Sequence, residues 1–320
     1  MSSATDATGP APAAIGPPSL PRHLLGPRYW PTWLGLGLLR GLSLVPMPLL
    51  WLLGSGLGQL ALLFPSRARR TVTTNLRLSF PALGPRQRRR LRRQHFRRLG
   101  QLALSVGVAQ WASAARLQRL VKFRDRHHYD EALAAGRNII LLAPHFLALD
   151  VAGMRLSQER SMMSMYKASK NALADWAMRR ARSRFGGAMI ERNAGLRPMI
   201  RMLREGKPFY YLPDQEPGDA DFVFAPFFGI PTATLTALGR MARLADAVVI
   251  PVCTRFLPHG RGYEAVFYPP LADFPTQDPV ANAARMNAAI EAGVRDMPAQ
   301  YMWTYKRYKR RPPGEASLYS

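Results

Sequence analysis

The sequence predicts an α/β fold in which a mixed or largely parallel sheet is flanked by helices. From about residue 112 onward, short apolar runs alternate with segments of helical periodicity. Such alternation is typical of parallel strands that are joined by helices. The chain has 320 residues, of which 48% are apolar, so it has enough apolar surface for one large domain or two ordinary ones. We therefore expect one α/β domain over residues 112–320.

Each element of this domain is assigned from its apolar spacing. The run Asn138-Ile139-Ile140-Leu141-Leu142 is uninterrupted by polar residues and predicts a buried strand. In chain order, strands are expected at 138–143, 162–166, 188–190, 208–212, 248–254 and 263–268, and helices at 149–156, 172–184, 196–204, 233–244 and 280–295. The single cysteine, Cys253, lies inside one of these strands and excludes an internal disulfide. We interpret it as a packing residue, because free cysteines are usually buried.

A long uncharged run precedes this domain. Residues 1–28 are rich in Ala, Pro, Gly and Ser and are expected to form a disordered tail. From Gly41 to Phe64, 24 residues carry no charge, which is long enough for a transmembrane helix. Pro46, Pro48 and several glycines favour a kinked or re-entrant segment instead. We expect residues 29–66 to anchor the protein to a membrane; the alternative is a buried helical hairpin.

The next segment, residues 67–111, is strongly basic. Twelve arginines and no acidic residue lie between Arg67 and Arg98. Positive charge beside an apolar segment marks the cytoplasmic side of a membrane and attracts anionic lipid by about 1 kcal/mol per residue. Apolar residues recur in this segment at near-helical spacing, at Leu91, Phe96, Leu99, Ala103 and Val106. The pattern fits either an amphipathic helix that lies on a membrane or a solvated arginine face.

The net charge of the whole chain is +25 and indicates acidic partners. Nucleic acid, an anionic membrane and an acidic protein or substrate all fit this charge. Nucleic-acid binding has no support beyond charge, because the sequence has no zinc-ligand spacing, no RNP-type aromatic signature and no heptads.

His145 is the strongest candidate for a catalytic residue. It follows the first predicted strand, and Asp150 comes five residues later, early in the next helix. A carboxylate at this distance can orient an imidazole and stabilise its protonated form, which makes the imidazole a general base. No Gly-x-Ser-x-Gly motif supplies a nucleophile and no residue cluster has metal-ligand spacing, so direct transfer from a donor onto a hydroxyl is the natural mechanism. A purely structural histidine is the alternative.

Other polar residues follow the predicted strands at the same end. They are Lys167 and Asn171 after the second strand, Glu191 and Arg192 after the third, and Asp214, Gln215 and Glu216 after the fourth. The carboxyl ends of parallel strands are where open α/β sheets bind their ligands. We therefore expect these residues to lie near His145.

Several sequence blocks carry a resemblance to a known family. His145-x4-Asp150 matches the His-x4-Asp/Glu motif of the glycerolipid acyltransferase superfamily. The chain further resembles the lipid A biosynthesis late acyltransferases (the lauroyl/myristoyl transferase family) in three blocks: Tyr211-Leu212-Pro213-Asp214-Gln215-Glu216, Val223 to Gly229, and Gln300 to Trp303 with the following Arg307-Tyr308-Lys309. The similarity extends from about Trp30 to Tyr319.

This resemblance implies a fold, an activity and a location. The fold is that of the glycerol-3-phosphate acyltransferases. The activity is transfer of a fatty acyl chain from acyl carrier protein, with acyl-CoA as a possible donor, onto a hydroxyl of an acyl chain of a lipid A precursor. The location is the cytoplasmic face of the bacterial inner membrane. The partners are then acyl carrier protein, the lipid A precursor and anionic membrane lipid, with no nucleic acid, no cofactor and no metal.

The resemblance also assigns roles to the candidate residues. His145 is expected to be the general base and Asp150 the residue that fixes its tautomer. Arg192 is expected to stabilise the oxyanion or hold a substrate phosphate; a surface salt bridge with Glu191 is the alternative. Lys167 and Asn171 are expected to bind phosphate or sugar. Asp214 and Gln215 either bind substrate or organise the pocket, and Phe227 and Phe228 either line an acyl groove or belong to the core.

Two other functions stay open. The first is an acyltransferase of the same fold that acts on another glycolipid or phospholipid. The second is a non-catalytic basic protein that binds membranes or nucleic acid. The acyl chain length, the hydroxyl that is acylated and the oligomeric state do not follow from the sequence.

Overall fold

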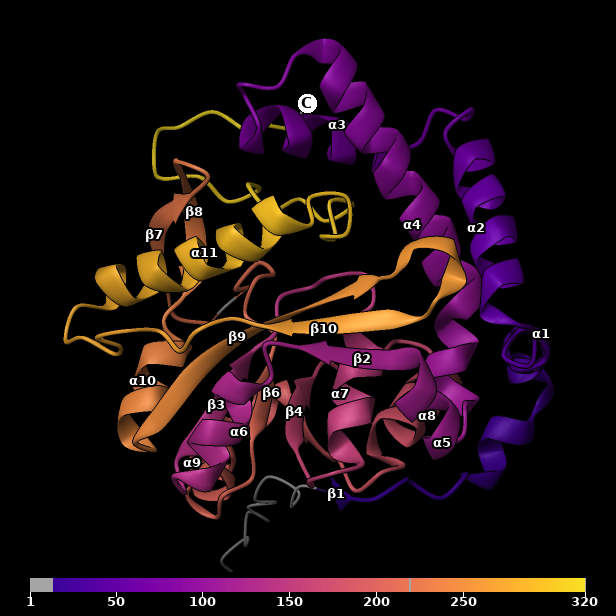
Figure 1. Cartoon of the computed structure of the whole chain (residues 1–320), viewed down its shortest axis with the longest axis horizontal. Coiled ribbons are helices and arrows are strands. Elements are labelled where there is room, and N and C mark those ends of the chain that lie inside the picture. The colour runs from indigo at the N-terminus through magenta and orange to yellow at the C-terminus, as the bar shows by residue number, and fades with distance from the viewer. Residues whose placement is uncertain (1–13, 219, 320) are drawn as a thin grey trace, which may run out of the picture.

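An eight-stranded mixed sheet forms the centre of the computed structural model, which describes residues 14–218 and 220–319 (Figure 1). The strand order is β1-β5-β4-β6-β3-β9-β10-β2. The strands of this sheet are β1 (Ala14–Ile15), β2 (Val121–Arg124), β3 (Asn138–Leu142), β4 (Met163–Tyr166), β5 (Ala188–Glu191), β6 (Phe209–Tyr211), β9 (Ala247–Phe256) and β10 (Tyr263–Phe267). The neighbours from β5 to β9 are parallel, whereas β1 and β10 pair antiparallel with β5 and β9. The expectation of a largely parallel sheet is therefore confirmed.

Helices cover both faces of this sheet. The helices of the domain are α5 (Ala114–Leu120), α6 (His127–Ala134), α7 (Leu149–Ser157), α8 (Ala172–Ser183), α9 (Arg197–Arg204), α10 (Ala237–Leu244) and α11 (Pro279–Asp296). Alternate residues of β3 belong to two different apolar clusters: Ile140 and Leu142 pack with α9, α10 and α11, and Ile139 and Leu141 pack with α6 and α7. Because both faces of β3 are buried, its sequence is a continuous apolar run.

A two-stranded hairpin stands apart from the sheet and packs on α11. Its strands are β7 (Phe222–Phe227) and β8 (Ile230–Leu235). The two residues between them, Phe228 and Gly229, both have positive φ, at 50° and 76°. Such a pair matches the turn that joins strands by two residues, and Gly adopts positive φ without strain. The helix expected over 233–244 is therefore wrong at its start, because β8 continues to Leu235 and α10 begins at Ala237.

Four helices precede the domain. They are α1 (Trp30–Leu42), α2 (Met47–Ala61), α3 (Arg67–Ser79) and α4 (Pro85–Trp111). The uncharged run from Gly41 to Phe64 is broken at residues 43–46, where α1 ends and α2 begins. Within the described ranges, no helix is both long enough and apolar enough to cross a bilayer. The break agrees with the two prolines, since Pro46 lies just before α2 and Pro48 in its first turn.

Glycines allow α2 and α4 to touch backbone to backbone (Figure 1). A Cβ atom added at Gly58 would lie 1.9 Å from the carbonyl oxygen of Phe96, and one added at Gly100 would lie 2.0 Å from that of Gly54. Gly107 meets α1 in the same way, 2.1 Å from the carbonyl oxygen of Leu39. Any side chain at these positions forces the helices apart.

The outer sides of α1 and α2 carry an exposed apolar face. Its members are Trp30, Leu34, Leu38, Leu44, Leu49, Leu52, Leu53, Leu57, Leu60, Leu63 and Phe64, each at least 44% exposed. The apolar side of α4 is different, because Leu91 and Phe96 are buried against the rest of the protein. The amphipathic pattern of α4 is therefore explained by packing within the protein, and its arginines form the outer face.

The expectation of a disordered tail over residues 1–28 is wrong for residues 14–28, which are folded onto the domain. Residues 1–13, to which the expectation also applies, lie outside the described ranges. Ala14–Ile15 extend the sheet beside β5, and two short 3-10 helices follow at Arg22–Leu25 and Pro27–Tyr29. The indole of Trp176 donates to the carbonyl oxygens of Pro18 and Ser19. Composition alone misses this segment, because its order comes from contacts with α8 and β5.

Candidate active site

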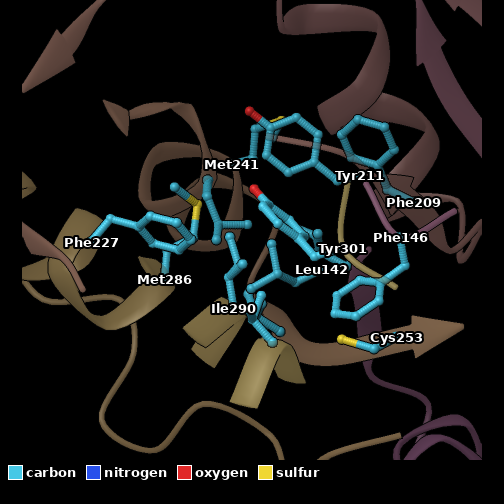
Figure 2. Close-up of a cluster of buried hydrophobic side chains, with 14 of the residues drawn as sticks. Leu142, Phe146, Phe209, Tyr211, Phe227, Met241, Cys253, Met286, Ile290 and Tyr301 are labelled. Atoms are coloured by element: carbon cyan, nitrogen blue, oxygen red, sulfur yellow. The ribbon is translucent and has the colours of Figure 1, made fainter. Parts of the chain in front are cut away.

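The loop after β3 is held in place by the C-terminal part of the chain. The backbone N–H of Leu147 donates to the carbonyl oxygen of Gln300 at 2.9 Å, and that of Met302 donates to the carbonyl oxygen of His145 at 2.9 Å. Phe146 is fully buried, and its ring lies 5.6 Å from that of Tyr301. Figure 2 shows Tyr301 inside the apolar cluster, between Phe146 and Phe227. These contacts fix the backbone on both sides of His145.

Asp214 is the hydrogen-bond partner of His145. Its Oδ1 lies 2.6 Å from Nδ1 of the imidazole, and its Oδ2 accepts the backbone N–H of His145 at 2.9 Å. The register of the sheet explains this contact, because Leu142 of β3 pairs with Tyr211 of β6 and each functional residue lies three positions further along its strand. The imidazole is 18% exposed and the carboxylate 1%. The ring is therefore fixed at Nδ1 and reachable from solvent.

The surroundings of Asp214 keep it charged. Burial by itself raises the pKa of this carboxyl group, but the charge and the two hydrogen bonds of His145, together with the charge of Arg307, outweigh burial and lower the pKa. Arg307 is itself buried, and it donates to the carbonyl oxygen of Ala233 and to Asn287 Oδ1. Burial and the charge of Asp214 raise the pKa of the Tyr301 hydroxyl well above its usual range, so this group stays protonated. A charged Asp214 in this setting stabilises an imidazolium at His145.

Asp150 does not take the position that its spacing predicts. Its Oδ1 lies 2.9 Å from the guanidinium of Arg182 on α8, and the described residues include no hydrogen bond between Asp150 and His145. The reason is that α7 begins at Leu149 and directs the Asp150 carboxylate to α8. The carboxylate at Nδ1 of His145 is therefore that of Asp214 and not, as expected, that of Asp150. The catalytic contribution of Asp150 stays a prediction, now coupled to Arg182.

The Asp150–Arg182 pair lies at a narrow apolar slot. This cavity has a volume of about 40 Å³ and lies among α7, β4, β5 and β6. Four methionines line it: Met154, Met162, Met163 and Met189. Methionine side chains are unbranched and adapt to irregular apolar ligands.

A basic pocket of about 470 Å³ lies at the carboxyl ends of β4 and β5. Lys167, Arg192 and Asn193 line it together with Glu191. Arg192 donates to the carbonyl oxygen of Pro217, in the loop that follows Asp214, and the described residues include no salt bridge between Arg192 and Glu191. Lys167 and Arg192 thus lie at the same edge of the sheet as the loop that follows Asp214, but neither His145 nor Asp214 lines this pocket, so their expected proximity to His145 stays a prediction.

Asn171 has a structural position instead of the expected ligand-binding one. Its side-chain oxygen accepts the backbone N–H groups of Leu173 and Ala174, which caps the N-terminus of α8, and its amide nitrogen donates to Thr32 of α1. Because both ends of its amide have partners within the protein, Asn171 has no free group for a phosphate or sugar. Gln215 is exposed directly beyond Asp214, and its role stays a prediction.

Three further sequence predictions concern packing. Phe227 is fully buried and belongs to the main core cluster, and Phe228 packs at the edge of the same cluster. Cys253 is 1% exposed, and burial raises the pKa of its thiol well above the usual range. It is confirmed as a packing residue.

Within residues 14–218 and 220–319, no group of three or more His, Cys, Asp or Glu side chains is placed to hold a metal ion.

Comparison with known proteins identifies the family. The model of the bacterial lipid A biosynthesis acyltransferase family matches residues 18–310. The chain is 34% identical to the lipid A biosynthesis lauroyltransferase of Escherichia coli K12 over 303 residues, which cover 94% of this chain and 99% of the relative. It is 33% identical to the palmitoleoyltransferase of the same organism over 299 residues, covering 93% and 97%. It is 31% identical to the myristoyltransferase over 307 residues, covering 94% of both chains.

The matches include the strand–loop–helix segment of His145 and every block from which the resemblance was drawn. That resemblance is therefore confirmed. With an oriented imidazole at the carboxyl edge of its sheet, this chain belongs to the bacterial lipid A biosynthesis acyltransferase family and is an acyltransferase.

Proposed function

We propose that the protein transfers a fatty acyl chain from acyl carrier protein onto a hydroxyl of an acyl chain of a lipid A precursor, a secondary acylation in lipopolysaccharide biosynthesis. The observation that supports this most is the His145–Asp214 pair, since it supplies an oriented base in a family named for lipid A acylation. The donor and acceptor come from the resemblance and from the names of the relatives.

The reaction needs one base and no protein nucleophile. The imidazole Nε2 of His145 removes the proton from the acceptor hydroxyl as its oxygen attacks the thioester carbonyl carbon. Asp214 accepts the Nδ1–H and stabilises the imidazolium that forms. When the tetrahedral intermediate collapses, the C–S bond breaks and the imidazolium returns the proton to the leaving sulfur. The products are an ester and a free thiol, so atoms and charge balance.

We assign different parts of the substrate to the basic pocket and to the methionine-lined slot. We assign an acceptor phosphate to Lys167 and Arg192, because two cationic side chains line one pocket beside the Asp214 loop. We assign the end of an acyl chain to the methionine-lined slot, which opens as these side chains change rotamer. The Asp150–Arg182 pair lines the slot at the start of α7.

The apolar face of α1 and α2 supports a position on the cytoplasmic side of the bacterial inner membrane. Eleven large apolar side chains on one outer surface are more than a monomeric soluble protein usually exposes together. The arginine-rich outer face of α3 and α4 follows directly in the chain and attracts anionic lipid. The net charge of +25 also favours an acidic carrier protein.

An acylation assay with membranes tests the chemistry. His145→Ala at unchanged protein level is expected to lower the rate by about 10² or more, since a general base contributes that much. Near-normal turnover would exclude His145 from the mechanism. The assay is run with acyl-carrier-protein and acyl-CoA thioesters of the same chain, and a higher kcat/KM for the first supports the proposed donor.

Lipid analysis separates the proposed acceptor from the alternative. In a deletion strain, mass spectrometry of lipid A is expected to reveal the loss of one secondary acyl chain. An unchanged lipid A together with a missing acyl chain on another glycolipid or phospholipid would favour the second candidate, an enzyme of the same fold with a different acceptor.

A further inference from the structure

A second large groove lies outside the site described above. It has a volume of about 660 Å³ and lies between α2, α4, the last residue of α11 and residues 297–300, which follow it. This volume is in the usual range for ligand pockets, about 300–1,000 Å³. Neither His145 nor Asp214 lines the groove, and its inner end is closed by Gln300, whose side chain binds the backbone N–H and C=O of Phe256.

Two adjacent guanidinium groups give this groove its charge. Arg97 and Arg98 of α4 both line it, and neither forms a salt bridge with any residue of the described ranges. Burial and the positive charge of Arg97 lower the pKa of Arg98, so the charged form of this side chain lacks a compensating anion. The other charged groups in the groove are compensated, because Arg255 pairs with Glu264, and Asp296 accepts from Arg124 and Tyr268.

The α2 wall of the groove continues onto the outer surface of the helix, because Leu52 lines the groove and also belongs to the exposed apolar face. Ser55 and Gln59 line the same wall, and both side chains form hydrogen bonds within the protein. The groove therefore joins two arginines to an apolar exit.

We propose that this groove binds one anionic phospholipid of the membrane, with its phosphate between Arg97 and Arg98 and its acyl chains along Leu52 and the outer face of α2. The phosphate supplies the negative charge that the two guanidinium groups lack within the protein. A bilayer lipid fits better than a soluble phosphate ester, because the apolar exit is continuous with the surface that we assign to the membrane. The lipid then bridges α2, α4 and the segment before Tyr301, beside the catalytic loop.

Binding is measured on the full chain in neutral detergent micelles by native mass spectrometry. Dioleoylphosphatidylglycerol is the anionic probe, dioleoylphosphatidylcholine the neutral one and inorganic phosphate the soluble one. We expect one tightly held phosphatidylglycerol, bound about tenfold better than phosphatidylcholine, and no retained phosphate. The His145→Ala variant is expected to bind like the wild type, which separates this groove from catalysis.

Two variants test the groove itself. Arg97→Gln with Arg98→Gln should reduce the preference for phosphatidylglycerol to about twofold or less, whereas Arg90→Gln with Arg93→Gln removes the same charge from exposed positions of α4 outside the groove. Gly56 lines the groove, and a Cβ added there meets no atom within 4 Å, so Gly56→Phe fills the groove without a clash in the protein. Gly37→Phe is its control, because Gly37 of α1 is equally open.

The proposal holds if the two groove variants lose the bound lipid and their two controls keep it, with unchanged circular dichroism. It is overturned if the wild type binds both lipids equally, if Arg90→Gln with Arg93→Gln reduces binding as much as the groove pair does, or if Gly56→Phe retains phosphatidylglycerol. Retention of inorganic phosphate in place of lipid also overturns it.

Discussion

Asp214 binds His145 twice, once at the imidazole Nδ1 and once at the backbone N–H, although the two residues are 69 positions apart in the chain. The carboxylate therefore fixes the side chain and the main chain of the same residue. Each of its two oxygens accepts one hydrogen bond from His145, so the orientation of the imidazole ring depends on a charged acceptor.

Asp214→Asn is expected to lower kcat by about 10³ with a folded protein. An amide has one acceptor oxygen, so it cannot serve both the backbone N–H and Nδ1–H, and it removes the charge that stabilises an imidazolium. Steady-state kinetics with membranes measures the effect, and thermal unfolding of the purified variant serves as the control. A loss of less than about fivefold would exclude Asp214 as the partner of the base.

Asp150→Asn and Arg182→Gln are each expected to lower kcat by about tenfold, and the double variant by no more than either alone. The reason is that the two side chains form one ion pair, so removal of either partner leaves the same defect. A double-mutant cycle of kcat measures this coupling. If Asp150 instead assisted His145 directly, its variant would match Asp214→Asn and Arg182→Gln would be almost harmless.

Arg192→Gln is expected to raise KM for the phosphorylated acceptor by about tenfold and to change kcat less than threefold, because a phosphate contact is made equally before and during the reaction. Lys167→Gln should behave alike. Lys170→Gln is the control, since this exposed lysine of the same loop does not line the pocket. With an acceptor that lacks the phosphate, the three variants should have the same KM. If Arg192→Gln instead lowers kcat and leaves KM unchanged, Arg192 stabilises the oxyanion.

His95 is expected to make the folded state sensitive to acid. This side chain is fully buried, and burial lowers its pKa to about 4 despite its contact with the carbonyl oxygen of Ala299. The unfolded chain, in which the pKa is near its ordinary value, binds more protons between about pH 6.5 and 4. The contribution of His95 to the free energy of unfolding is therefore fully present above about pH 6.5 and falls by about 3 kcal/mol as the pH reaches 4.

Denaturant titrations of detergent-solubilised protein at pH 7 and 4.5 measure this loss. His95→Asn retains a donor at the place of Nδ1 and removes the titrating ring, so its free energy of unfolding should depend less on pH than that of the wild type. The exposed His127→Asn is the matched control. An equal pH dependence for all three proteins would contradict the assignment to His95.

Replacing Leu38, Leu53 and Leu57 by Gln should weaken binding to anionic vesicles by tenfold or more, since each buried leucine contributes about 1.5–3 kcal/mol. All three side chains are exposed, so the fold should not change. Flotation with vesicles measures the bound fraction. Leu244→Gln, at a 50% exposed leucine of α10, should bind like the wild type; equal loss in both would reject the α1–α2 face as the contact.

The element that carries His145 is predictable from the sequence. An uninterrupted apolar run predicts β3, and its end places His145 at the edge of the sheet. The partner of His145 was not predictable from spacing, because it depends on which strands are neighbours. Once β6 is known to pair with β3 at Leu142 and Tyr211, equal offsets of three residues bring His145 and Asp214 together. The signal in the sequence is that His145 and Asp214 each lie three residues after the last residue of an apolar strand, so they become neighbours if those strands pair in register.

The errors elsewhere have similar causes. The β7–β8 hairpin turns at Phe228–Gly229 without the Asn-Gly or Asp-Gly pair that usually marks such turns, so the sequence predicts no hairpin here and a helix over the last three residues of β8, 233–235. Asn171 resembled a ligand-binding residue, but its place directly before α8 makes it a cap. In both cases the local residue types were compatible with two structures, and only tertiary contacts decide between them.

The close approach of α2 to α4 at Gly54, Gly58 and Gly100 has a mechanical consequence. Helices that meet through their main chains have no layer of side chains between them, so α2 has little room to shift against α4, which in turn contacts α7 and α8 of the domain. On the proposed membrane placement, the depth of the leucines in the lipid then sets the distance of His145 from the membrane surface.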